Sequence, residues 1–204
     1  YGETCGAITG GIRYATHLFN AMNGIHHRSP GAVTALLEDP RVAVEVISDG
    51  HHVQPPALRL INRMKSEDRV ILVSDSTHPC GLKDGRYRFA GAEVYLRDGV
   101  VRQKNGTLAG SALTLERALA VQVKEVGTPL EKAIRYCTKN PASAVGASRR
   151  LGSIAPGRSA DLVLLDALSV LIQAPEVMLR VHVALLGAQP KMKRRLREVL
   201  LLAA

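Results

Sequence analysis

The chain has 204 residues, a formal net charge of +9 and a hydrophobic fraction of 46%. This length is enough to bury a core, but it is short for a complete α/β barrel, which typically needs about 250 residues. The hydrophobic fraction excludes a mainly disordered protein, because disordered chains carry too little apolar surface to offset their conformational entropy. No apolar run approaches the roughly 18 residues that a membrane span needs, so we expect no membrane partner.

The positive charge does not single out a nucleic-acid-binding protein. Basic residues are spread along the chain, with the densest cluster between Lys191 and Arg197. The sequence has no Trp and only two Phe, so it lacks the aromatic platform on which single strands stack. We expect no nucleic-acid partner, and a small anionic substrate fits the charge as well.

The cysteines indicate a reducing compartment. Cys5, Cys80 and Cys137 have neither the even number of a disulfide framework nor a CxxC zinc spacing, which predicts a cytoplasmic protein. The first residue is Tyr1 rather than Met, and no signal-peptide pattern follows it. We therefore expect the chain to begin inside a larger protein.

Extended and helical stretches alternate in the first part of the chain. Turn signals and periodicity predict strands at 12–17, 41–48 and 69–73 and helices at 32–38 and 55–65. This βαβαβ order is typical of a parallel sheet. The strands run into polar residues, namely His17, then His51 and His52, then Ser74 to Ser76. In parallel barrels the chemistry lies at such strand ends.

The pattern changes after Pro79. A hairpin is expected over 87–103 with its turn at Arg97-Asp98-Gly99, and a loop of small residues over 106–111. Helices are expected at 113–126 and 129–139, then turns and a strand up to Asp166, and a basic amphipathic helix at 190–202. These elements divide the chain into 1–140, with a hairpin insertion near 86–104, then 141–166, and an unassigned basic tail at 167–204.

Two strand ends carry candidate site residues. An isolated His is more often structural than a ligand, but His17 is followed by Asn20, His26, His27 and Arg28. Imidazole is a good ligand for zinc or iron, and a guanidinium can hold a phosphate with two parallel hydrogen bonds.

Asp75 follows the apolar strand at 69–73, where an isolated Asp would by default cap a turn. Close to a metal-bound water, however, an aspartate can accept a proton during attack and later deliver it to the leaving amine.

A series of motifs in this order resembles the N-acetylglucosamine-6-phosphate deacetylases of the amidohydrolase superfamily. The motifs lie at 15–22 with 26–31, then 48–53, 73–75, 106–111, 140–142 and 152–161. The run Thr-His-Leu-Phe-Asn-Ala-Met at 16–22 is the most diagnostic, and the stretch at 152–161 marks amidohydrolases more generally. The matched portion covers roughly residues 1–166.

The resemblance implies a role for each matched site residue. These are His17 as a metal ligand, Asn20 and Ala21 as contacts to the amino sugar, Arg28 as the anchor of its 6-phosphate, His52 as a substrate contact, Asp75 as the catalytic acid and base, and Leu108, Ala109 and Gly110 as the loop that closes over the sugar. His51 precedes the matched histidine and is given no role.

The implied fold class is α/β, the C-terminal part of a metal-dependent TIM-type (β/α) barrel plus part of a small β domain. The resemblance assigns residues 1–140 to the barrel portion and 141–166 to the segment of the small β domain. The family's other ligands, a glutamate and a second histidine, are expected upstream of Tyr1, and none of His26, His27 or His78 takes an equivalent place. We therefore expect this chain alone to bind zinc or iron weakly or not at all. Relatives in the family are commonly dimers, so a homodimer is expected for the intact form.

Three functions remain open. The first is hydrolytic deacetylation of N-acetyl-D-glucosamine 6-phosphate in amino-sugar catabolism, with this chain a truncated form. The second is a catalytically inactive remnant that binds a sugar phosphate or a partner. The third is a related amidohydrolase acting on another amide, which Asn20, Ala21 and Arg28 argue against because they suit a phosphorylated amino sugar.

Overall fold

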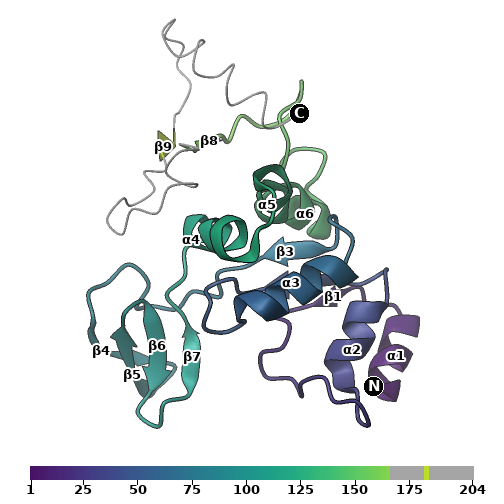
Figure 1. Ribbon diagram of the computed structural model, residues 1–204. Coiled ribbons are helices and arrows are strands. Elements are labelled where there is room, and N and C mark those ends of the chain that lie inside the picture. Colours follow the sequence, from purple (N-terminus) through teal and green to yellow (C-terminus); the bar gives the residue numbers. More distant parts are fainter. Residues whose placement is uncertain (166–181, 184–204) are drawn as a thin grey trace, which may run out of the picture.

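The computed structural model describes residues 1–165 and 182–183 (Figure 1). Its helices are α1 (Gly2–Thr9), α2 (Gly31–Glu38), α3 (Pro55–Met64), α4 (Leu115–Val121), the π-helix η1 (Gln122–Val126), α5 (Leu130–Cys137) and α6 (Lys139–Ala144). Its strands are β1 (Tyr14–Ala15), β2 (Ala43–Val46), β3 (Val70–Leu72), β4 (Gly85–Phe89), β5 (Ala92–Arg97), β6 (Val100–Gln103), β7 (Leu108–Ser111), β8 (Val163–Leu164) and β9 (His182–Val183). The predicted helix at 190–202, and the basic tail at 167–204 apart from β9, lie outside the described residues.

A parallel sheet with the strand order β1-β2-β3 forms the centre of the molecule. Val44 of β2 pairs with Val70 of β3, and both side chains are fully buried. Such apolar strands are typical of parallel sheets that are covered on their faces. The predicted βαβαβ order is confirmed, although the strand expected at 12–17 is reduced to the two residues of β1.

The described residues form an open sheet rather than a closed barrel. Its strand ends nevertheless follow the rule for parallel sheets, because all three carboxyl ends lie at the same edge. That edge carries the segments after β1, β2 and β3, which the sequence predicts to contain the site.

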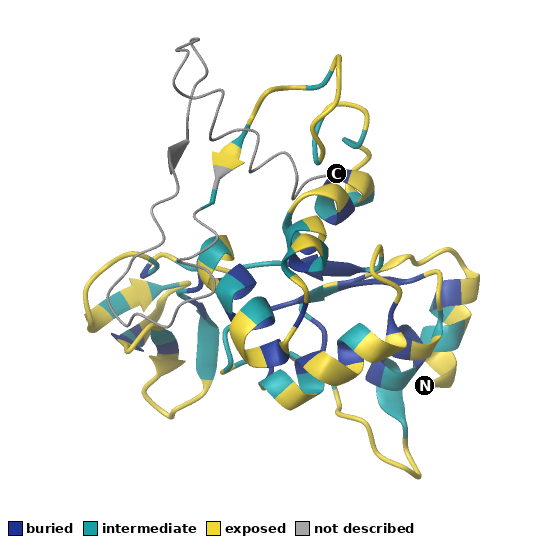
Figure 2. Cartoon of the chain, turned by 45° about the horizontal axis from the view of Figure 1, so that its top comes forward, coloured by how far each residue is buried: buried dark blue, intermediate teal, exposed yellow. Residues whose placement is uncertain are grey.

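The helices form a connected layer around this sheet. Helix α1 contacts α2, α2 contacts α3, and α3 contacts η1, while α5 and α6 pack against β3. The buried faces of helices α1 to α5 and of β1, β2 and β3 meet in the main apolar core, whose residues are among those drawn dark blue in Figure 2. Helix α3 begins with two prolines, which suit a first turn whose N–H groups have no partner inside the helix.

Helix α1 was not expected from the sequence. It contains two glycines within eight residues, Gly2 and Gly6, and glycine weakens a helix interior. The side chain of Ile8 is almost fully buried in the core, so packing against α2 stabilises a helix that local preference does not predict.

A second, antiparallel sheet has the order β4-β5-β6-β7 and lies beside the first (Figure 1). Its turns are tight, with positive φ at Ala90 and Gly91 and at Asp98 and Gly99, the backbone geometry that two-residue hairpins favour. The turn predicted at Arg97-Asp98-Gly99 is confirmed. The single hairpin predicted over 87–103 is wrong in its first strand, because a second turn at Ala90 and Gly91 separates β4 from β5. The loop predicted over 106–111 is wrong for its second half, because Leu108–Ser111 forms β7 and pairs with β6.

The two sheets meet at one junction. Ser76, just past β3, forms an isolated parallel bridge with Ser111 at the end of β7. The Thr77 backbone N–H donates to the Ser111 carbonyl at 2.9 Å, and the Ser111 N–H donates to the Asp75 carbonyl at 3.1 Å. The antiparallel sheet is therefore fastened to the segment that carries Asp75.

The helix expected over 113–126 is divided into α4 and the π-helix η1, which ends at Gly127 with a φ of 79°. Gln122 begins η1 and is fully buried. Its side-chain nitrogen donates to Ser48 Oγ at 3.2 Å, and its side-chain oxygen accepts from Asn62 at 3.1 Å and from the Thr128 hydroxyl at 2.8 Å. π-Helical turns occur mainly as single insertions and frequently near functional sites, and this one positions an amide against Ser48 after β2.

Candidate active site

The segment after β1 wraps back over the central strand. The Leu18 N–H donates to the Glu45 carbonyl at 2.8 Å, and the Asn20 side chain donates to the carbonyls of His17 and Leu18 at 3.2 and 3.3 Å. Asn20 therefore holds its own loop in the described structure, and its side-chain donors are used within that loop.

The same segment is strained. His17, Phe19 and Ala21 have φ values of 34°, 75° and 55°, although none of them is glycine. Conformations of this kind cost on the order of 1–3 kcal/mol each and persist only where the surroundings enforce them. Their concentration directly after β1 points to a segment whose geometry has a purpose beyond stability.

The central strand adds a carboxylate that the sequence analysis missed. Glu45 on β2 is half-buried, and burial is the largest cause that raises its pKa, with the nearby Asp75 raising it further. His17 opposes this shift through its charge and through a hydrogen bond from its backbone N–H. The signal was available, because Glu45 is the one acidic residue in an otherwise apolar stretch from Val42 to Ile47. The structure thus brings both His17 and Asp75 into electrostatic range of Glu45.

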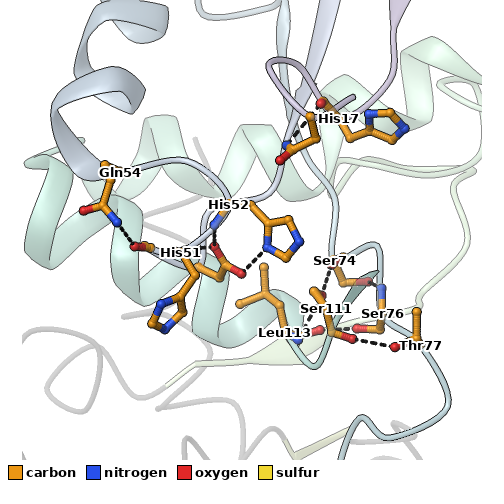
Figure 3. A network of polar contacts seen from close by, with 12 residues as sticks. His17, His51, His52, Gln54, Ser74, Ser76, Thr77, Ser111 and Leu113 are labelled. Atoms are coloured by element: carbon orange, nitrogen blue, oxygen red, sulfur yellow. Dashed lines mark hydrogen bonds and ion pairs between the residues drawn. The ribbon is translucent and has the colours of Figure 1, made fainter. Parts of the chain in front are cut away.

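Asp75 follows β3 in an exposed position with a φ of 47°. The residues around it are tied to the end of β7 and the residues just after it by hydrogen bonds from Ser111 Oγ to the Ser74 carbonyl and from Ser76 Oγ to the Leu113 carbonyl (Figure 3). These bonds hold the backbone on both sides of Asp75, while its side chain stays open to a ligand.

The segment after β2 presents a paired histidine and aspartate. The ring of His52 contacts the Asp49 carboxylate, with 2.6 Å between Nδ1 and Oδ2 (Figure 3). The other oxygen, Oδ1, accepts the backbone N–H groups of His51 and His52, each at 2.8 Å. Burial acts to raise the pKa of Asp49, but the hydrogen bonds from His52 and His51 outweigh it and the pKa is lowered.

Leu108, Ala109 and Gly110 lie on β7, next to the Asp75 segment rather than in a free loop. Gly110 has a φ of 72°, and a Cβ at this position would overlap Thr77 Cγ2. Only glycine allows this close approach of β7 to the segment after β3.

Arg28 lies apart from this group of residues. It is exposed in the loop before α2, where its Nη1 contacts His27 Nε2 at 2.7 Å and its backbone N–H contacts His26 Nδ1 at 3.4 Å. Within the described part of the chain no hydrogen bond or ion pair joins Arg28 to His17, His52 or Asp75.

His17 has the character of a metal ligand, but the described residues do not complete a metal site. Its Nδ1 is buried and has no hydrogen-bond partner in residues 1–165, which fits a donor atom reserved for another group. Among those residues, however, no three His, Cys, Asp or Glu side chains are grouped so that they could hold a metal ion. His17 is a single candidate donor, and we derive no chemical step through a metal from this chain.

An open hollow of about 910 Å³ lies elsewhere, along the antiparallel sheet. Its lining includes His51, Arg86, Tyr95, Arg97 and Arg102, but none of His17, His52 and Asp75. Volume alone therefore does not identify the site, and the strand ends of the parallel sheet remain the better candidate because titratable groups converge there. No helix of the described residues is long and apolar enough to cross a membrane.

Comparison with known proteins identifies two kinds of relatives, some named N-acetylgalactosamine-6-phosphate deacetylase and others named N-acetylglucosamine-6-phosphate deacetylase. The chain is 40% identical over 165 residues to N-acetylgalactosamine-6-phosphate deacetylase from Escherichia coli O157:H7, covering 81% of this chain and 44% of the relative. It is 35% identical over 167 residues to N-acetylglucosamine-6-phosphate deacetylase from Vibrio furnissii, covering 82% of this chain and 42% of the relative.

Solved structures show the same similarity in three dimensions. The structure of a mutant N-acetyl-D-glucosamine-6-phosphate deacetylase from Mycobacterium smegmatis, in complex with N-acetyl-D-glucosamine-6-phosphate, superimposes with a TM-score of 0.77 at 40% identity. The match covers 82% of this chain and 45% of that structure. The chain thus spans less than half the length of these three proteins.

The sequence profile of the amidohydrolase family matches residues 3–190, which is most of the chain. The matched span includes all three strands of the parallel sheet and the antiparallel sheet beside it. The chain therefore belongs to the amidohydrolase family.

Proposed function

We propose that this chain is part of a deacetylase that hydrolyses N-acetyl-D-glucosamine 6-phosphate to D-glucosamine 6-phosphate and acetate in amino-sugar catabolism. The observation that carries the proposal is the convergence of His17, Glu45 and Asp75 at one edge of a parallel sheet, with the paired Asp49 and His52 after the neighbouring strand. The names of the relatives, all phosphorylated amino-sugar deacetylases, supply the substrate class.

In this proposal Asp75 is the acid and base. It accepts a proton as a water oxygen forms a bond to the acetamide carbonyl carbon, and it delivers that proton to the amine nitrogen as the carbon–nitrogen bond breaks. Its exposed carboxylate, held by a backbone that is fixed on both sides, suits a group that has to reach water and substrate in turn. Asp75 lies close enough to Glu45 to help raise the pKa of the Glu45 carboxyl, so we add Glu45 to the site.

The other residues bind the sugar. We assign a sugar contact to His52, to the Asn20 loop with the Ala21 backbone, and to β7 through Leu108, Ala109 and Gly110. Arg28 is the proposed 6-phosphate anchor, and its exposed position leaves room for a phosphate site near the subunit interface of a homodimer.

Amidohydrolases are generally metal-dependent, and a zinc or iron ion would polarise the carbonyl and activate the water. His17 would be one ligand, with the remaining donors supplied from outside the described residues. We propose that this chain alone holds such an ion weakly or not at all, because affinity depends on several donors fixed at once. We also propose a cytoplasmic location, since Cys5, Cys80 and Cys137 are free thiols.

A second candidate is N-acetylgalactosamine 6-phosphate as the substrate. It is raised by the name of the Escherichia coli O157:H7 relative, which refers to the galactosamine sugar and is 40% identical to this chain. The Mycobacterium smegmatis structure, named for the glucosamine sugar, is also 40% identical, so sequence identity does not separate the two substrates. The two sugars differ in the orientation of one hydroxyl group, so the same catalytic residues would serve either.

The test is acetate release by the purified chain from each of the two sugar phosphates, with added zinc or iron and an Asp75→Asn control. Release that the control abolishes supports the deacetylase, and the preferred sugar decides between the two substrates. Sugar-phosphate binding without acetate release would favour the inactive remnant. A chain that neither binds the sugar phosphates nor releases acetate would contradict the proposal for the chain as it stands.

A further inference from the structure

We infer that Asp49 is a positioning residue that fixes the tautomer of His52, so that Nε2 of the ring faces the ligand as a hydrogen-bond acceptor. The group that His52 recognises is then a donor, a sugar hydroxyl or an amide N–H, rather than a phosphate oxygen. The identity of the ligand rests on the proposed function, but the tautomer does not.

The geometry around Asp49 leaves little freedom. Oδ1 accepts two backbone N–H groups, from His51 and His52, and Oδ2 lies 2.6 Å from His52 Nδ1. Both side chains are largely buried, with 6% of His52 and 11% of Asp49 exposed. The carboxylate is therefore held in one orientation by hydrogen bonds within a single turn, and the ring is held by the carboxylate.

This arrangement decides where the proton of a neutral imidazole lies. The pKa of Asp49 is lowered, so the carboxylate has no proton to give and acts only as an acceptor. The hydrogen between Oδ2 and Nδ1 must then belong to the ring, which leaves the lone pair on Nε2. Among the described residues only Asp49 hydrogen-bonds the His52 ring, so Nε2 remains open to a ligand.

The consequence for recognition follows from this lone pair. An unprotonated Nε2 accepts a hydrogen bond from a hydroxyl or an N–H group, whereas it repels an anionic oxygen. Arg28, which only donates, has the opposite character and suits the phosphate. His52 is therefore suited to a hydroxyl or N–H group of the sugar phosphate, and Arg28 to its phosphate group.

The experiment is nitrogen-15 NMR of the histidine rings in the full-length labelled chain, with the Asp49→Asn variant for comparison. In the wild-type protein the neutral form of His52 is expected to be protonated at Nδ1. In the variant, the backbone N–H groups of His51 and His52 still need an acceptor, so they hold the new side chain with its amide oxygen in the place of Oδ1. Its amide nitrogen therefore takes the place of Oδ2 and donates to Nδ1, so the ring proton should move to Nε2.

A matched control is Asp39→Asn, because Asp39 also accepts a backbone N–H two residues later, from Arg41, but lies outside the candidate site. This variant should leave the His52 spectrum unchanged. An Nε2-protonated ring in the wild type, or the same tautomer in wild type and Asp49→Asn, overturns the inference. A variant that unfolds is replaced by Asp49→Glu, which keeps an acceptor and should preserve the Nδ1 proton.

A second measurement separates this inference from the proposed function. In a titration, N-acetyl-D-glucosamine 6-phosphate should bind the wild-type chain about tenfold more tightly than Asp49→Asn, the loss expected for one hydrogen bond whose acceptor has become a donor. Equal affinities of the wild type and Asp49→Asn would contradict the inference that His52 accepts a hydrogen bond from the ligand. The absence of binding to the wild type would contradict the proposed ligand, while the NMR result would still decide the tautomer.

Discussion

Gly110 lies against Thr77 so closely that a single added methyl group would overlap Thr77 Cγ2. Thr77 cannot simply turn away, because its hydroxyl donates to the Ser111 carbonyl at 3.1 Å. The contact joins β7 to the segment that carries Asp75.

Gly110→Ala should therefore lower the free energy of unfolding by roughly 2–4 kcal/mol, since it combines a left-handed backbone with an overpacked contact. The control is Gly91→Ala, which has a similar φ of 79° but no atom within 4 Å of the added carbon. Gly91→Ala should lower the free energy of unfolding by about 1–2 kcal/mol, the cost of the left-handed backbone alone. Urea unfolding measures both, and in a Thr77→Ser background the two costs should become similar. Equal costs in the wild-type background would show that the overlap does not matter.

Gln122→Met should destabilise the fold by roughly 2–4 kcal/mol, because it leaves the buried Ser48 and Thr128 and the half-buried Asn62 without their shared partner. Methionine has a similar volume, so the loss reports hydrogen bonding rather than a cavity. Thermal unfolding compares it with Gln103→Met, an exposed position where a change within about 0.5 kcal/mol is expected. Similar shifts for the two variants would mean that the buried amide network contributes nothing.

Lys65 should make the free energy of unfolding rise with pH in the alkaline range. Burial is the main cause that lowers its pKa from 10.5 to about 8, and its Nζ donates to the Asp39 carbonyl at 2.6 Å. Between these values the unfolded chain binds more protons than the folded one, so stability from this group increases as pH rises, and below about pH 8 it is constant.

The measurement is the difference in unfolding free energy between wild type and Lys65→Met, taken from urea unfolding at several pH values from about 7 to 10. The subtraction cancels the tyrosines and Cys137, whose raised pKa values act in the opposite direction. The difference should grow in favour of the wild type above about pH 8. A flat difference, as expected for the exposed Lys83→Met control, would show that Lys65 is not desolvated.

Arg28→Ala should weaken binding of N-acetyl-D-glucosamine 6-phosphate by roughly 10- to 100-fold, because it removes charge-assisted hydrogen bonds to the phosphate. Binding of unphosphorylated N-acetyl-D-glucosamine should not change. Calorimetric titration compares it with Arg41→Ala, an exposed arginine that pairs with Asp39 instead. An equal loss for both sugars would show that Arg28 acts on the fold and not on the phosphate.

The order of the parallel sheet and the turn at Asp98-Gly99 could be predicted because their signals are local. Strand β7 could not, since Leu108 to Ser111 are mostly small residues without an alternating pattern, and their strand depends on pairing with Val100 and Arg102. The π-helix depends on bonds between Gln122 and residues more than 50 positions away, Ser48 and Asn62, which no sequence window contains.

In the candidate site, too, the features with local sequence signals could be predicted, and those that depend on distant contacts could not. Strand ends marked by His17 and Asp75 follow from apolar strands that stop at polar residues, although their roles stay predictions. The nearness of Glu45 to both depends on the register of β1, β2 and β3, so it could be seen only in three dimensions. The pairing of Asp49 with His52 spans three residues and was available from the sequence, but a turn carboxylate is too common to signal a role on its own.

The antiparallel sheet has its own small core of Val94, Leu96 and Val101, separate from the main core. Substitutions in the two cores share no neighbours, so their energetic effects should simply add. In evolutionary terms, the antiparallel sheet can change its sequence without compensating changes in the parallel sheet. The exception is the junction at Ser111, where a substitution in β7 requires a compensating substitution in the segment after β3, and the reverse.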